Sequence, residues 1–232
     1  MTGTEKNTGL LNGGLVLIDK PYRWTSFDAV NKVRTVLRKY YGIKKIKVGH
    51  AGTLDPLATG LVIICTGKMT KEIHQYQSLE KEYRATFMLG KTTPSFDLET
   101  EVDKEYETAH ITRELVDEAV KKFTGDIDQV PPLFSAKFID GKRAYKHARK
   151  GDNVELPAAR VSIREISVER LELPELELNI ICSKGTYIRS LARDIGFELQ
   201  SGAYLSALKR TRIGDYRLES ALSPKEFENS LE

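Results

Sequence analysis

Short apolar runs bounded by turn residues indicate β-strands in several parts of the chain. The run from Leu61 to Cys65 is continuously apolar and too short for a core helix, which indicates a strand buried on both faces. The stretch from Lys81 to Gly90 alternates instead, so that Tyr83, Ala85, Phe87 and Leu89 would share one face. The same criteria predict strands at 14–21, 161–173 and 176–182, the last two forming a hairpin joined at Pro174 and Glu175.

Other segments have the spacing of helices. Thr25 and Asp28 stand where a capping box would, and apolar residues then recur at helical intervals as far as Gly42. We predict further helices at 70–77, at 112–124 with Leu115, Ala119, Val120 and Phe123 on one face, and from 188 onward with Ile188, Leu191, Ile195 and Leu199 on one face. Strands and helices in this order predict the α+β class.

Length and composition are those of an ordinary globular protein. The chain has 232 residues, of which 40% are hydrophobic and 30% charged. The polar start of the chain is unlike a signal peptide, and no apolar stretch reaches the roughly 18 residues that a membrane span needs, so we expect a cytoplasmic protein. Cys65 and Cys182 lie in separate apolar runs without suitably spaced partners, which predicts buried thiols and neither a disulfide framework nor a metal site.

Charges are segregated along the chain although the net charge is only +3. Basic residues collect without acidic ones between Ala29 and Leu54, and again between Lys137 and Lys150 with Asp140 alone against them. Either run could be a solvated helix face. Two such runs flank the loop from Lys47 to Gly60, which is a candidate catalytic loop. Together they favour a partner rich in phosphates, such as a nucleic acid.

A loop between two predicted strands carries the candidate reactive group. In the stretch from Lys47 to Gly60, three glycines permit tight turns, and Pro56 restricts Asp55 to an extended conformation. Local chemistry leaves two interpretations open. Asp55 could cap its own backbone in an Asx-turn, or it could be a carboxylate held on a stiff turn for catalysis.

The run from Val48 to Gly60 closely resembles the catalytic motif of the TruB family, the bacterial tRNA pseudouridine-55 synthases. Ala51 stands where that family usually has Thr, while the surrounding glycines and the Asp-Pro pair are intact. The resemblance implies that Asp55 is the catalytic residue. It assigns His50 to filling the space that the flipped target base leaves.

Further motifs of the family follow in the same order and supply the remaining candidate site residues. Asp19-Lys20-Pro21 followed by Thr25-Ser26 resembles its N-terminal motif, with Arg23 where Gly is usual, and places Lys20 near the active site. The resemblance implies that Tyr83 stacks on the target uracil and that Arg189 pairs with the catalytic Asp. It also implies that Tyr187 lines the pocket and that Leu208 lies against the base. Asp97, in a loop resembling T-x-T-x-D, is a secondary candidate. Without the resemblance, Tyr83 would be interpreted as an ordinary core aromatic.

The segment from Gln129 to Gly151 resembles the thumb of the family, which we place at about 130–152. Its cations Lys142, Arg143, Lys146 and Arg149 are interleaved with Tyr145 and His147, a composition able to close on RNA. These four cations are the predicted RNA-binding residues.

The resemblance implies a pseudouridine-synthase fold, a mixed and mostly antiparallel sheet flanked by helices, in a single catalytic domain over 1–232 without the PUA domain of most relatives. The implied reaction converts a uridine in the T-arm loop of tRNA to pseudouridine with base flipping and needs no cofactor and no metal. The expected partner is the T-arm stem-loop, with no membrane, no obligatory protein partner and a monomeric state, and the protein could also act as a tRNA folding chaperone. Two alternatives remain: a guide-RNA-dependent pseudouridylase subunit and a non-catalytic RNA chaperone.

Overall fold

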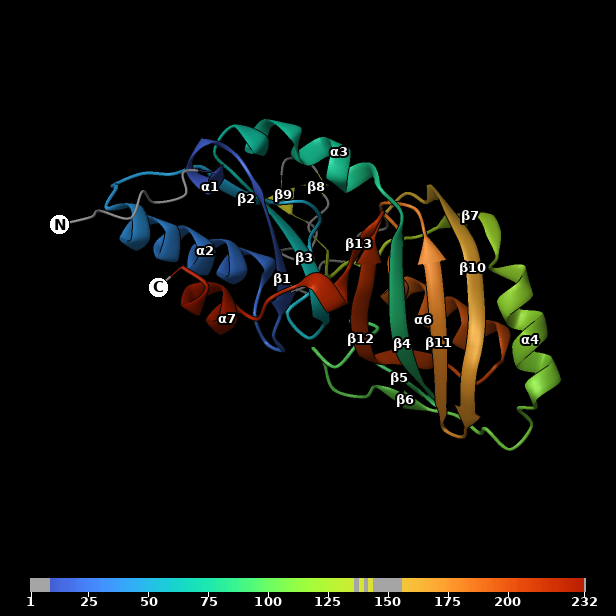
Figure 1. Ribbon diagram of the computed structural model, residues 1–232. Helices are drawn as coiled ribbons and strands as arrows, with labels where there is room; N and C mark the ends of the chain where they lie inside the picture. The colour runs from blue at the N-terminus through green and yellow to red at the C-terminus, as the bar shows by residue number, and fades with distance from the viewer. Residues whose placement is uncertain (1–8, 136–137, 140–141, 144–155, 232) are drawn as a thin grey trace. The chain divides into compact units, whose positions relative to one another are not determined.

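The computed structural model describes residues 9–135, 138–139, 142–143 and 156–231. The chain forms two compact units: unit 1 comprises 1–82 together with 209–232, and unit 2 comprises 83–208. Two strands, β4 (Lys81–Leu89) and β12 (Ala203–Ile213), pass from one unit into the other along the chain (Figure 1).

Unit 1 is built around β3 (Thr59–Thr66), whose residues are nearly all buried, as the continuous apolar run predicts. Antiparallel partners of β3 are β1 (Leu15–Lys20) and β2 (Val48–His50), and the end of β12 runs parallel to it. β13 (Tyr216–Arg217) pairs with β12. The side chain of Ala51 packs in an apolar cluster with Leu61, Ile63, Cys65 and Ile213, which suits a methyl group at this position.

The main helix of unit 1 is α2 (Ser26–Tyr41), and its predicted ends are confirmed. Thr25 and Asp28 form a reciprocal capping box, and Gly42 ends the helix in the left-handed conformation with φ of 67°. The helix predicted at 70–77 is instead a 3₁₀ helix, η1 (Gly67–Glu72), continuing into α3 (Ile73–Ser78). Shorter helices of this unit are α1 (Gly9–Asn12), η2 (Leu218–Ser220) and α7 (Pro224–Asn229).

In unit 2 the strand order is β12-β4-β11-β10-β7. The predicted hairpin is confirmed as β10 (Ala159–Glu172) paired antiparallel with β11 (Glu175–Cys182), and β10 also pairs antiparallel with β7 (Gly125–Gln129). Alternate residues of β4 are buried, as its pattern predicts. The small antiparallel pairs are β5 (Lys91–Thr92) with β6 (Lys104–Glu105), and β8 (Phe138–Ile139) with β9 (Lys142–Arg143).

Two helices of unit 2 match predicted segments. Helix α6 (Ile188–Glu198) buries Ile188, Leu191 and Ile195, as predicted. Helix α4 (Arg113–Lys122) begins after its N-cap, Thr112, but the predicted apolar face is wrong at one position. Leu115 is 42% exposed, whereas Val116, Ala119 and Val120 are buried, because the face that packs inward is rotated by one residue.

The sheets are mixed and mostly antiparallel with helices beside them, which confirms the predicted fold class. Among the described residues, no helix is both long enough and apolar enough to cross a membrane.

Candidate active site

Asp55 lies in the loop that joins β2 to β3 in unit 1, directly before a rigid buried strand. Its side chain is partly exposed, whereas its neighbour Leu54 is buried. The amide of Ala58 donates to the backbone carbonyl of Asp55 at 3.1 Å, so a backbone hydrogen bond closes the turn that contains Pro56. The loop therefore has a fixed backbone course at the residue that carries the candidate carboxylate.

Lys20, the last residue of β1, supports this loop from inside. Its side chain is fully buried, and Nζ donates to the carbonyl oxygens of Trp24 at 2.6 Å, Pro21 at 3.1 Å and Pro56 at 3.4 Å. Burial lowers the pKa of Lys20 to about 8, and the negative charge of Asp55 opposes that shift. Lys20 therefore supports the loop from the protein interior, and its pKa depends on the charge of Asp55.

Two residues next to the start of α2 hold the loop on either side of Asp55. The hydroxyl of Ser26 donates to the carbonyl of Leu54 at 3.1 Å and accepts from its amide at 2.8 Å. The amide of Arg23 donates to the carbonyl of Pro56 at 2.8 Å. Arg23 has φ of 66°, a left-handed conformation that costs a residue with a Cβ about 1–2 kcal/mol, which explains why a glycine suits this position.

Arg210 contacts the loop at both of its ends. It is 1% exposed, and its guanidinium donates to the carbonyls of Leu61 at 2.7 Å, Gly52 at 3.2 Å and Thr53 at 3.4 Å. Its backbone lies against Gly60, where φ is 102° and an added Cβ would come within 2.4 Å of the Arg210 carbonyl oxygen. Both ends of the Asp55 loop are thus attached to β12.

His50 ends β2 at the start of the same loop and is partly buried. Burial is the main cause that lowers its pKa, the charge of Arg210 lowers it further, and the backbone of Gly52 acts in the opposite direction. The imidazole is therefore biased toward its neutral form. A neutral aromatic ring suits the base-replacing role that the resemblance implies.

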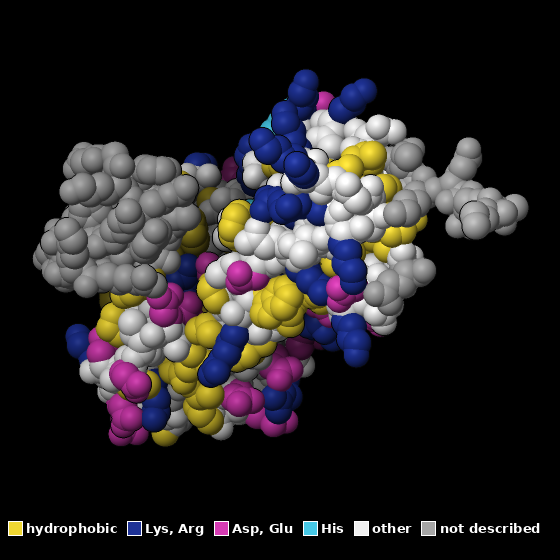
Figure 2. All heavy atoms as spheres, turned by 90° about the vertical axis from the view of Figure 1, so that its left-hand side faces the viewer, with side chains coloured by type: hydrophobic (Ala, Val, Ile, Leu, Met, Phe, Trp, Pro, Cys, Tyr) yellow, Lys and Arg dark blue, Asp and Glu magenta, His cyan; other side chains and the backbone are white. Residues whose placement is uncertain are grey.

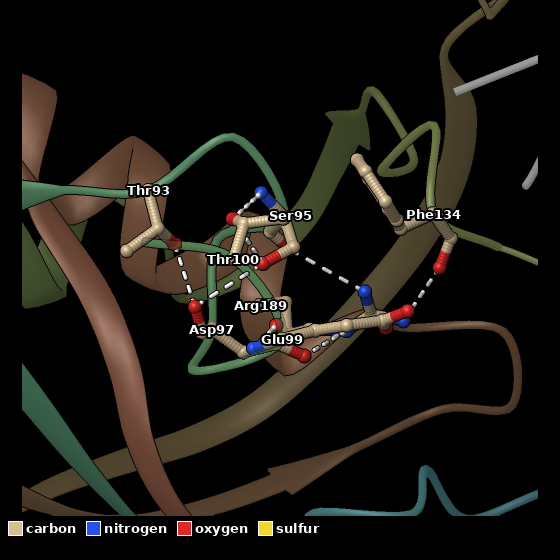
Figure 3. Close-up of polar contacts among 7 residues, drawn as sticks. All are labelled: Thr93, Ser95, Asp97, Glu99, Thr100, Phe134 and Arg189. Carbon is tan, nitrogen blue, oxygen red and sulfur yellow. Dashed lines mark hydrogen bonds and ion pairs between the residues drawn. The ribbon is translucent and has the colours of Figure 1, made fainter. Parts of the chain in front are cut away.

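Unit 2 holds a second group of candidates around Arg189, in the first turn of α6 (Figure 3). Arg189 is 4% exposed, and its Nε lies 3.5 Å from Oδ2 of Asp97. Its two terminal nitrogens donate to the carbonyls of Phe134 at 3.0 Å and Ser95 at 3.4 Å. The structure therefore pairs these two predicted site residues with each other, across 92 positions of sequence in unit 2.

The loop that presents Asp97 is held by hydrogen bonds of its own (Figure 3). Oδ1 of Asp97 accepts from the amide of Glu99 at 2.9 Å, and its carbonyl accepts from the hydroxyls of Thr93 at 2.7 Å and Ser95 at 3.1 Å. Pro94 occupies the second position of the turn closed by the Phe96 amide and the Thr93 carbonyl, a position that proline favours. This proline therefore fits the loop.

The remaining candidates of unit 2 lie on its regular elements. Tyr83 is on the buried face of β4 and is 8% exposed, and Leu208 is partly buried on β12. Tyr187 is the N-cap residue of α6, at the predicted junction of strand and helix. Gln129 fixes its backbone, because the side-chain amide accepts from the Tyr187 amide at 2.8 Å and donates to its carbonyl at 3.1 Å.

The predicted residues thus fall into two groups. Lys20, His50 and Asp55 are in unit 1, and the candidates around Arg189 are in unit 2, so pairing of Arg189 with Asp55 stays a prediction. The thumb cations Lys146 and Arg149 lie outside the described residues, as do the side chains of Lys142 and Arg143 in β9. Within the described part of the chain, no three His, Cys, Asp or Glu side chains gather as they would to hold a metal ion.

Sequence reasoning missed the residues that hold the loop. Ser26 is inside the stretch that resembles the N-terminal motif of the family, and Arg210 lies two positions after Leu208 in a stretch that resembles the family pattern L-x-x-L-x-R-x-x-x-G. Only those motifs could have singled the two residues out. Sequence reasoning also missed Lys68 and Lys71, which line a hollow of about 350 Å³ in unit 1 together with Lys47. Figure 2 shows Lys and Arg side chains gathered in its upper part.

Comparison with known proteins identifies close relatives over nearly the whole chain. Residues 38–188 match the TruB family pseudouridylate synthase N-terminal domain. The chain is 59% identical over 220 residues to tRNA pseudouridine synthase B of Phocaeicola vulgatus, covering 95% of this chain and 94% of that protein. It is 52% identical over 223 residues to the protein of the same name from Flavobacterium johnsoniae, covering 96% and 97%.

Solved structures with the same fold are more distant in sequence. A Cbf5-Nop10-Gar1 complex contains a chain that is 25% identical, with a TM-score of 0.69 over 95% of this chain. An H/ACA RNP bound to a substrate RNA containing 2′-deoxyuridine contains one that is 23% identical, with a TM-score of 0.66. This chain spans about half the length of each of them, 54% and 53%.

Proposed function

Because this chain belongs to the TruB family of pseudouridylate synthases, we propose that it isomerises the T-arm uridine of tRNA with Asp55 as the catalytic carboxylate. The observation that supports this role is the way the Asp55 loop is held. Lys20, Ser26 and Arg210 bind the backbone on both sides of Asp55, so the carboxylate is presented from a rigid support. Catalysis depends on such positioning, since a displacement of 1 Å can cost about a hundredfold in rate.

The proposed reaction conserves atoms and electrons within the nucleotide. The C1′–N1 bond of the uridine breaks, the uracil turns, and a C5–C1′ bond forms as C5 releases its proton and N1 gains one. An ionised Asp55 can act as a nucleophile on the ring or sugar, or as the base that removes the C2′ proton. Both routes require a carboxylate and no change in oxidation state.

The target base must leave its stack before it can react, at a cost of a few kcal/mol. We propose that Tyr83 stacks on the extruded uracil, that Tyr187 and Leu208 line its pocket and that His50 fills the vacated space. Arg189 and Asp97 would act as one buried ion pair, because Asp97 is held by three hydrogen bonds and in turn orients the guanidinium.

We propose that cations of unit 1 bind the tRNA backbone, together with the four predicted thumb cations. Lys47, Lys68 and Lys71 are exposed around one hollow, where they can neutralise neighbouring phosphates. The protein would act in the cytoplasm as a monomer without an obligatory protein partner. Turnover of a naked tRNA by the pure protein separates this proposal from a guide-dependent subunit.

The experiment that tests the catalytic assignment is the variant Asp55→Asn. The change is nearly isosteric, so folding and tRNA affinity should be retained while pseudouridine formation is abolished. Pseudouridine mapping on a tRNA transcript, with and without the substitution, measures both the activity and the modified position. Normal product formation by the variant would remove Asp55 from the mechanism, and product outside the T-arm loop would overturn the proposed substrate. A folding-chaperone activity would survive the substitution.

A further inference from the structure

A buried arginine holds the loop that carries Asp55. The guanidinium of Arg210 binds the carbonyls of Gly52 and Thr53, which precede Asp55, and that of Leu61, which follows it. Arg210 is 1% exposed and lies in the same unit as Asp55. Its charge also contributes to lowering the pKa of both Lys20 and His50, so it acts at the centre of this group.

Burial of a charged guanidinium is costly unless its donors are satisfied. Here Nε and both terminal nitrogens each have a carbonyl acceptor, between 2.7 and 3.4 Å away. The approach is possible because Gly60 has no side chain, since a Cβ there would lie 2.8 Å from the Arg210 amide nitrogen. The parallel register of Arg210 with Gly60 fixes the backbone of β12 beside the same loop.

We propose that Arg210 is a positioning residue for the isomerisation, which sets the location of the Asp55 carboxylate by fixing the backbone on both sides of it. This inference rests on the proposed catalytic role of Asp55. Arg210 acts through the loop, so its removal should slow the chemical step and leave tRNA binding by the cations of unit 1 intact.

A lysine cannot reproduce this interaction. The guanidinium has five donors spread over a planar fork, which reaches three separate carbonyls, whereas an ammonium group is a single point with three donors. Arg210→Lys keeps the charge and most of the buried stem but replaces the planar fork with a single ammonium group. Arg210→Met removes both the charge and the donors.

The test is single-turnover kinetics with enzyme in excess, following tritium released from C5-labelled uridine in tRNA. We expect the rate constant to fall about a hundredfold in Arg210→Lys and at least as far in Arg210→Met. The dissociation constant for tRNA should stay within threefold of the unsubstituted protein. A merely structural role would give a different result: it would lower the folded fraction, measured separately by circular dichroism, and leave the rate constant at saturating folded enzyme unchanged.

Arg212 provides the matched control on the same strand. Its side chain binds Glu82 at 2.8 Å and Glu80 at 3.2 Å and makes none of the hydrogen bonds that hold the Asp55 loop, so Arg212→Lys should keep the normal rate constant. Rate constants within threefold of normal in Arg210→Lys would overturn the proposal for Arg210, while an inactive Asp55→Asn would leave the proposed function standing. If Asp55→Asn is active, the proposed role of Asp55 falls, and the positioning role of Arg210 falls with it.

Discussion

At the scale of single residues, Lys20 shows how the support of the loop is linked to protonation. Its ammonium group is buried against three carbonyls, and burial lowers its pKa from the ordinary 10.5 to about 8. The folded state therefore releases this proton at a lower pH than the unfolded chain does. Between about pH 8 and 10.5 the unfolded chain binds more protons, so Lys20 makes the free energy of unfolding rise with pH across that window.

We predict that this rise disappears in Lys20→Met. Urea unfolding at several pH values measures the difference in unfolding free energy between the two proteins. That difference should increase by at most about 1.4 kcal/mol per pH unit from about pH 8 and level off near pH 10.5. Because the charge of Asp55 raises the pKa of Lys20, Asp55→Asn should move the start of the rise to lower pH. A difference that does not vary with pH would show that Lys20 is not titrating there.

At the scale of elements, features encoded locally could be predicted from the sequence. The ends of α2 follow from Thr25, Asp28 and Gly42, and the buried face of β4 follows from its alternation. The support of the Asp55 loop could not be predicted, because Arg210 reaches carbonyls that lie 149 to 158 positions away in sequence. The sequence around Arg210 does not show what its side chain contacts: Arg210 binds the loop, whereas Arg212, two positions further on, binds two glutamates.

Motif resemblance identified the candidate site residues but not their contacts. Arg189 and Asp97 were predicted separately, and only the fold of unit 2 brings them to 3.5 Å. The same limit applies to the proposed RNA-binding surface, since Lys68 and Lys71 belong to η1, and neither lies in a basic run that sequence reasoning recognised. Lys68 and Lys71 lie near Lys47 because the start of η1 pairs with the residue before β2, where the amide of Gly67 donates to the carbonyl of Lys47 at 2.9 Å.

We predict that reversing these three charges weakens tRNA binding. The triple variant Lys47→Glu, Lys68→Glu, Lys71→Glu should bind tRNA less tightly, and the slope of log K against log salt should become shallower by roughly 0.7–0.9 for each phosphate that the protein no longer neutralises. Filter binding across a salt series measures both effects. The single-turnover rate constant at saturating enzyme should be nearly unchanged, because the proposed role of these residues is to bind the RNA backbone and their side chains make none of the hydrogen bonds that hold the Asp55 loop.

Lys121→Glu is the control for this charge reversal, since Lys121 is exposed on α4 of unit 2. It should leave the salt slope unaltered. An unchanged slope in the triple variant would mean that the hollow of unit 1 is only a solvated surface.

At the scale of the whole molecule, the chain forms two compact units, but β4 and β12 each contribute residues to both. If β4 or β12 unfolds, both units therefore lose residues that belong to them. This sharing favours a single cooperative unfolding transition, as expected for one catalytic domain.

The two cysteines test this prediction without any engineered probe. Cys65 is buried in unit 1, where burial raises its pKa to about 11, and Cys182 is buried in unit 2. Pulsed thiol alkylation along a urea series, with each labelled peptide quantified by mass spectrometry, should give the same midpoint for both cysteines. Cys65→Ser and Cys182→Ser variants confirm which signal belongs to which thiol. Separate midpoints would show that the units unfold independently.

The discontinuity of unit 1 has a consequence for the chain during its synthesis. Asp55 leaves the ribosome early, whereas Arg210 and the rest of the closing segment follow only after the whole of unit 2 has been translated. Unit 2 is continuous in sequence and can start to fold while its neighbour still lacks a strand. If Arg210 sets the position of the carboxylate, a nascent chain should not reach its full rate of isomerisation until residue 210 has been made and can join the loop that carries Asp55.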